Sequence, residues 1–171
     1  MINILQQSLW KQFGASIDML KNTIEQCPDE YWNTNRKLFY MVYHTLVFLD
    51  YYLTIPAKPF SSPLPFTLTE PADIPTDAID DIIPNKIYSK EELLHYLQQN
   101  RNKCHDVIAG LTEEKLSERW QDTEGYRNYA VLELLMYNMR HVQHHAAQLN
   151  LLLRQGVNNA PAWVSRAKDD L

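Results

Sequence analysis

The chain has 171 residues and a mass of 20.1 kDa, the size of one domain, so we expect residues 1–171 to form a single unit. Hydrophobic residues make up 45% of the chain and charged residues 22%, which excludes a disordered protein. Sixteen Lys and Arg against twenty-one Asp and Glu give a net charge of −5. Because this charge produces no positive field to attract a phosphate backbone, we expect no nucleic-acid partner.

The N-terminal segment lacks the basic region, the apolar core and the cleavage site of a secretory signal, so we expect a cytoplasmic protein. The two cysteines of the chain, Cys27 and Cys104, stand far apart and in no metal-binding spacing. We therefore expect both to be reduced residues of the core.

The first half of the chain is predicted to hold two long helices. Four glycines are too few for the tight turns of an all-β protein, which favours helices. Apolar residues recur every three or four positions over residues 2–26, which predicts an amphipathic helix that ends before Pro28. The run over residues 38–55 is apolar almost all round but contains His44 and Asp50, and it is shorter than the ~20 apolar residues of a membrane span. We expect a central buried helix there and no membrane partner.

A long connection follows. Seven of the nine prolines fall between Pro56 and Pro84, so residues 56–88 are predicted to form a crossover without regular structure. Ser89 stands three residues ahead of Glu92, a capping-box pattern that predicts the start of a third helix.

The second half of the chain continues the helical pattern. The third helix is predicted over residues 90–110, a short helix over 112–119 and the last long helix over 129–155. Gly156 stands where a C-terminal cap is expected, and residues 156–171 form a tail. We therefore predict an all-α protein, a four-helix bundle with one long Pro-rich crossover between its second and third long helices.

Three of the six histidines, His141, His144 and His145, lie in one five-residue stretch of the last predicted helix. On a helical wheel His145 lies about 40° from His141, and both fall on the apolar face, whereas His144 is turned toward the polar edge. An i, i+4 pair of imidazoles on one face can share a metal ion. The alternative is that both are hydrogen-bonded core residues, and the spacing alone leaves the two interpretations open.

His44 is the candidate third ligand, because it lies in the middle of the most hydrophobic helix. Three nitrogen ligands from two helices would leave a position open for water or substrate, as in catalytic zinc sites. Four neighbours on the same helix faces are candidates for hydrogen bonds in the pocket, with ordinary core packing as their alternative role: Asn138, Gln148, Tyr40 and Tyr51. His95 and His105 lie in polar surroundings and are not expected to be ligands.

His44 in an apolar helix, the Pro-rich crossover and the HVQHHAAQL segment resemble the DinB/YfiT-like superfamily over nearly the whole chain. The resemblance implies a four-helix bundle that binds a divalent metal, zinc or nickel, through His44, His141 and His145. Ala146 and Ala147 stand where Arg-Gly is frequent in that family, so this chain lacks that Arg, whereas the three ligands are retained.

The resemblance also implies a small-molecule substrate. The first hypothesis is a metal-dependent transferase that joins a low-molecular-weight thiol, such as bacillithiol or mycothiol, to an electrophile. A metal-dependent hydrolase is the alternative within the same class, but the carboxylate of Asp50 lies about 240° round the helix from His44, which disfavours it. A noncatalytic ligand-binding or stress-related bundle protein is the alternative from another class.

Two irregular segments are expected to contribute to function. Residues 60–85 of the crossover are predicted to set substrate selectivity, or else to pack passively on the helices. In the tail, Trp163 is expected to close the end of the bundle or to contribute to a homodimer contact, as in some relatives.

Overall fold

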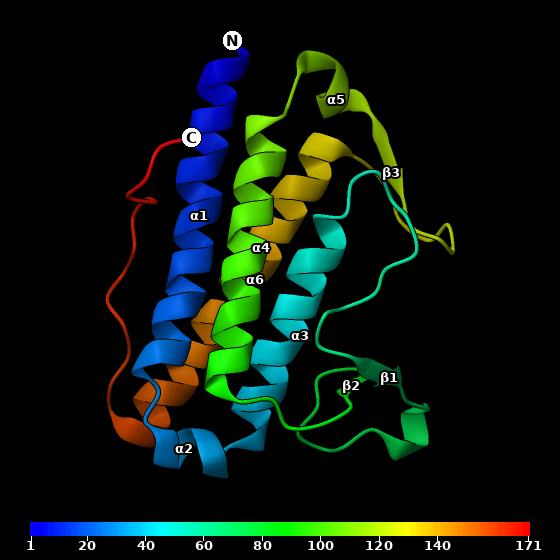
Figure 1. The fold of residues 1–171 in the computed structure, drawn as a ribbon. Coiled ribbons are helices and arrows are strands. Elements are labelled where there is room, and N and C mark those ends of the chain that lie inside the picture. The colour runs from blue at the N-terminus through cyan, green and yellow to red at the C-terminus, as the bar shows by residue number, and fades with distance from the viewer.

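The computed structural model describes all 171 residues, and helices make up most of it (Figure 1). The four long helices lie side by side: α1 (Ile2–Gln26), α3 (Arg36–Tyr52), α4 (Lys90–Ala109) and α6 (Val131–Val157). Helices α1 and α3 each pack against both α4 and α6, and a single large cluster of buried apolar residues fills the space between them. The prediction of a mostly helical protein is confirmed.

The helix starts are fixed by local hydrogen bonds. The side chain of Asn35 accepts a hydrogen bond from the backbone N–H of Leu38 and so caps α3. Ser89 and Glu92 form the predicted capping box at the start of α4. The largest difference from the predicted boundaries is at the end of α3, which was predicted at residue 55 and is observed at Tyr52.

Several short elements were not predicted. Helix α2 (Asp29–Thr34) links α1 to α3, and within the crossover β1 (Phe66–Leu68) pairs antiparallel with β2 (Ile82–Pro84) around a 3₁₀ turn at Pro71–Asp73. The prediction that the whole crossover lacks regular structure is therefore wrong. A two-stranded ladder tolerates Pro84 because an edge position needs no backbone donor.

A second hairpin follows the predicted short helix, observed as α5 (Glu113–Ser117). Strand β3 (Arg119–Gln121) pairs with β4 (Asn128–Ala130), and Gly125 lies in the turn between them with a positive φ of 79°. Burial of Trp120 against α3 and α6 holds this hairpin on the helices.

Gly156 does not cap the last helix, contrary to the prediction. It lies inside α6, and Asn158, in the left-handed conformation with φ 52°, is the cap. The reason for a glycine at 156 is close packing, because a Cβ there would stand 2.2 Å from the ring of Tyr31. The Tyr31 hydroxyl donates to the carbonyl of Leu152 and so ties α2 to α6.

Two further predictions concern the core and the tail. Cys27 and Cys104 are both buried and free, as predicted, and burial raises the pKa of the Cys27 thiol to about 11. Trp163 does not close the end of the helices: its side chain is 69% exposed and lies beside Met19, in the middle of α1. None of the helices combines the length and the apolarity that crossing a bilayer requires.

Candidate metal centre

The structure brings together the three histidines that the sequence singled out. His44 comes from α3, and His141 and His145 come from α6, which packs against it. Their ligand atoms all lie within 4.8 Å of one another, and the Nε2 atoms of His44 and His141 are 3.0 Å apart. His145 is buried and the His44 side chain is only 12% exposed, so the cluster is largely screened from water.

Two of the three rings are oriented by a hydrogen bond at Nδ1. His44 Nδ1 lies 2.7 Å from Asp80 Oδ2, and His145 Nδ1 lies 2.8 Å from Gln148 Oε1. Carboxylate and amide oxygens accept, so each Nδ1 carries the proton and each Nε2 keeps its lone pair. The third ring has no such partner, since Nδ1 of His141 is buried without a hydrogen bond.

Asp80 is the residue at the centre that sequence reasoning missed. It lies in the crossover just before β2, and its Oδ1 accepts a hydrogen bond from the backbone N–H of Ile82. The β1–β2 ladder therefore holds the carboxylate at the His44 ring. No periodicity links a loop residue to a helix 36 positions away, so the sequence carried no signal for this contact.

The surroundings of His141 and His145 lower the pKa values of both imidazoles. Burial, reinforced by repulsion from the neighbouring imidazoles, lowers the pKa of His141 to about 3. Burial likewise lowers the pKa of His145 to about 4. Both rings are neutral at pH 7, which is the form of imidazole that binds metals.

The residues present fit a divalent ion. Two nitrogens bound at 2.0–2.1 Å to a tetrahedral zinc stand about 3.3 Å apart, close to the 3.0 Å observed between His44 and His141. The lone pair of His145 Nε2 completes a set of three nitrogen donors, which suits zinc or nickel. The group contains three side-chain ligands and no fourth, which is the composition of an open metal site.

Of the four other predicted pocket residues, only Gln148 forms a hydrogen bond with a histidine. Asn138 donates to the backbone carbonyl of Leu49 at 3.0 Å, and its own Oδ1 is buried without a partner. Tyr40 packs on Phe39, and Tyr51 packs on Phe48 and Trp120. The structure contains no hydrogen bond from either tyrosine to the cluster.

Aromatic rings wall one side of the cluster. The ring of Phe48 lies 4.7 Å from that of His44 and 5.8 Å from that of His141. Tyr52 packs against both Phe48 and His141. These rings exclude water from one flank of the imidazoles, which strengthens any charge interaction there.

The remaining histidines lie outside the cluster. His144 is exposed, with its ring edge against His145. His95 is exposed beside Gln99, and His105 packs edge-on against Trp10. None of the three belongs to the group of ligand atoms that converge within 4.8 Å.

Asp50, weighed as a catalytic base from the sequence, belongs to a separate buried network. Lys103 donates to its Oδ1, and the Tyr96 hydroxyl donates to its Oδ2 at 2.8 Å. It therefore joins α3 to α4, as expected for a carboxylate that faces another helix.

The fold and the centre define a mostly helical protein with a three-histidine group able to hold a metal ion. The family model of the DinB superfamily matches residues 12–149, which include all three histidines. The chain belongs to the DinB superfamily, a metal-associated family. No curated protein matches the chain, and no solved structure matches it either.

Proposed function

We propose that this protein, a four-helix bundle of the DinB type with a Pro-rich crossover, is a metal-dependent transferase that joins a low-molecular-weight thiol to an electrophilic small molecule. One observation carries the proposal: three imidazoles converge from two helices without a fourth side-chain ligand. A closed structural zinc site has four protein ligands, so this composition favours a site that admits an exogenous ligand. Zinc or nickel is the ion that the donors suit best.

When bound, the divalent ion supplies Lewis acidity, which makes a coordinated thiol lose its proton at neutral pH. His44, His141 and His145 hold it, while Asp80 and Gln148 fix the orientation of two of the rings. In the overall reaction the thiol sulfur forms a bond to the electrophilic carbon, the leaving group departs with its electron pair, and the thiol proton passes to solvent. Phe48 and Tyr52 keep water away from one flank.

The carboxylates of the structure support a thiol over water as the nucleophile. A hydrolase needs a base that takes a proton from the attacking water. Asp80 contacts the cluster, but His44 and the N–H of Ile82 occupy its two oxygens. Asp50 is equally committed, to Lys103 and Tyr96. Hydrolysis is therefore the less supported reaction.

A noncatalytic small-ligand-binding protein is the second candidate function. The observation in its favour is that no free carboxylate and no tyrosine hydroxyl forms a hydrogen bond with the three histidines, because the one carboxylate there, Asp80, is held by His44 and Ile82. Such a protein would bind the thiol through the same three ligands without turning it over.

The test uses cobalt-substituted protein, because the visible spectrum of Co²⁺ reports its ligands. We expect bacillithiol or cysteine to change this spectrum, and the same thiol to react with monochlorobimane faster than without protein. His145→Ala should abolish both effects, whereas His144→Ala, which changes the adjacent exposed ring, should keep them. A spectral change without turnover of any electrophile would favour the binding protein. Neither effect, in a protein that holds cobalt, would refute the thiol proposal.

A further inference from the structure

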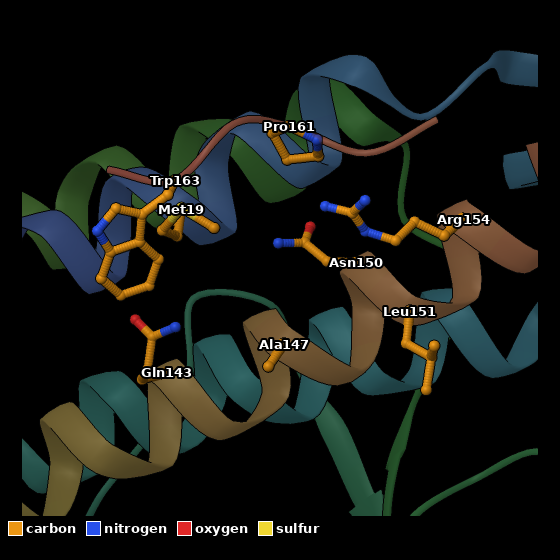
Figure 2. Close-up of a pocket in the computed structure, with 8 residues that line it drawn as sticks. All are labelled: Met19, Gln143, Ala147, Asn150, Leu151, Arg154, Pro161 and Trp163. Carbon is orange, nitrogen blue, oxygen red and sulfur yellow. The ribbon is translucent and has the colours of Figure 1, made fainter. Parts of the chain in front are cut away.

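A second concave site lies on the side of α6 that faces away from the histidines. Figure 2 shows the groove, which is bounded by α1, α6 and the C-terminal tail and has a volume of about 340 Å³. Its α6 residues include Gln143, Ala147 and Asn150, which are turned roughly 180° around the helix from His141. The groove is therefore separate from the candidate metal centre, and its volume lies in the range of small-molecule sites.

The tail forms a fixed roof over this groove. Its far end is anchored where the N–H of Ala167 donates to the carbonyl of Lys11 at 2.9 Å and where Arg101 pairs with Asp169. Nearer the groove, the N–H of Val164 contacts the sulfur of Met19 at 3.2 Å. The part of the groove formed by the tail is therefore held in place by hydrogen bonds and an ion pair.

The walls are apolar and partly open to water. The indole of Trp163 is 69% exposed, and Leu151 is 54% exposed. Met19 and Trp163 lie next to each other at one end of the groove (Figure 2). An exposed indole beside a thioether offers a flat surface on which an aromatic or other planar apolar group can stack.

Two polar side chains at one end of the groove, Asn150 and Arg154, carry hydrogen-bond donors that have no partner in the protein. Asn150 is only 9% exposed; its Oδ1 accepts from Thr23, but its amide nitrogen has no partner in the protein. Arg154 forms no ion pair, and its guanidinium lies beside the Asn150 amide (Figure 2). The lining contains no carboxylate. An anion at this point would accept a hydrogen bond from the Asn150 amide and pair with the Arg154 guanidinium.

We propose that this groove binds an organic anion with a flat apolar body, its acidic group at Asn150 and Arg154 and its body on Trp163. The acidic group is singly charged, a carboxylate or a sulfonate, because one guanidinium faces it. The competing explanation is that Arg154 only stabilises the carboxyl end of α6, where a basic residue complements the helix dipole. That role requires no ligand, so the two explanations differ in what binds.

The first test compares two probes of nearly the same shape. 8-Anilinonaphthalene-1-sulfonate carries an acidic group, and N-phenyl-1-naphthylamine lacks it, so fluorescence titrations of both separate the anion from the apolar body. Arg154→Gln should weaken binding of the sulfonate about tenfold and leave the neutral probe unchanged, the difference expected for one charge-assisted hydrogen bond. Arg140→Gln removes an exposed arginine of α6 that lies outside the groove and should change neither.

The second test fills the groove. Ala147 is exposed and lies in its floor, so Ala147→Phe should abolish saturable binding of both probes while the near-ultraviolet circular dichroism shows an intact fold. His145→Ala should keep full binding, which separates this site from the metal centre. Equal losses in the two arginine variants, or saturable binding that survives Ala147→Phe, would overturn the proposal. A stable dimer that Ala147→Phe dissociates would also overturn it, because the groove would then be an interface between two copies.

Discussion

The crossover between α3 and α4 and the tail after α6 are both irregular segments, yet they are held in different ways. The Tyr43 hydroxyl of α3 donates to the carbonyl of Leu64 and so attaches the crossover to that helix, and the Tyr88 hydroxyl, within the crossover, donates to the carbonyl of Pro65. The crossover then delivers one carboxylate, Asp80, to the histidines. Its contribution to the candidate metal centre is thus a single side chain.

The tail instead lies flat on the outside of α1. Lys11 donates to the carbonyls of Ala167 and Asp169, and Arg101 bridges Asp169 to Asp18 of α1. Ala167 is buried against Gly14, where a Cβ would stand 2.8 Å from that of Ala167. The tail therefore contributes a surface. Changes in the crossover should alter metal binding, whereas changes in the tail should alter stability.

The largest expected effect is a loss of stability at low pH that comes from the histidine cluster and not from the tail. In the metal-free protein the pKa values of His141 and His145 are about 3 and about 4, below the ordinary 6.5, so the unfolded chain binds more protons once the pH falls below 6.5. Stability is therefore fully present above pH 6.5 and is lost toward pH 4, by up to about 1.4 kcal/mol per pH unit for each imidazole. The groups that face these rings are His44, His144 and Asp80.

Urea unfolding in the presence of a chelator at pH 7.5, 6.0 and 5.0 measures this loss. The Arg101 pair should not contribute in this range, because its guanidinium holds the pKa of Asp169 below the ordinary value. A variant that replaces both His141 and His145 by Gln should show a flatter pH dependence. Equal slopes for the variant and the wild type would contradict the account of the buried imidazoles.

The next effect concerns the hydrogen bond between Asp80 of the crossover and His44. Asp80→Asn removes the charge that orients His44 and should weaken metal affinity about 10–100-fold, the usual cost of losing such a partner. Asp81→Asn changes an exposed neighbour and should have no effect. Competition with a chromophoric chelator gives both affinities, and unchanged affinity in Asp80→Asn would remove the crossover from the centre.

The tail is tested at Arg101. Arg101→Ala breaks the ion pairs with Asp18 and Asp169 and should lower the free energy of unfolding by about 1–2 kcal/mol, since the arginine side chain is 15% exposed and its partners are more open. Arg166→Ala is the control, because Arg166 is an exposed arginine of the tail itself and forms no ion pair. Metal affinity should be the same in both variants, and a loss in Arg101→Ala alone would show that tail and centre are coupled.

The smallest effect is expected at Gln148. Its amide is a neutral partner of His145, so Gln148→Leu should weaken metal affinity only about threefold, less than Asp80→Asn. The same competition assay ranks the two variants. The reverse order would mean that α6 itself, rather than the crossover, orients the ligands.

The long helices and the histidine cluster could be predicted because both follow from periodicity. The spacing of His141 and His145 places them on one face, and His44 was visible as a costly imidazole in an apolar run. Contacts between distant segments have no such signature. Asp80 reaches His44 only through a hairpin in the crossover, and Gly156 serves the ring of Tyr31 rather than a helix cap.

The short strands were missed for a related reason. Strands of three residues carry too little alternation to be recognised, and pairing between Trp120 and Tyr129 depends on burial of the indole in the folded protein. The groove under the tail was equally invisible, because Trp163 becomes a neighbour of Met19 only after the tail has folded back over α1.

The central claim is that His44, His141 and His145 together hold one divalent ion. The measurement is metal content by plasma mass spectrometry on untagged protein, beside His145→Ala and His144→Ala purified identically. The account predicts close to one zinc, nickel or other divalent ion per chain in the wild type and in His144→Ala, and loss of that ion in His145→Ala. No metal in the wild type after reconstitution with several ions, or equal content in all three proteins, would contradict it.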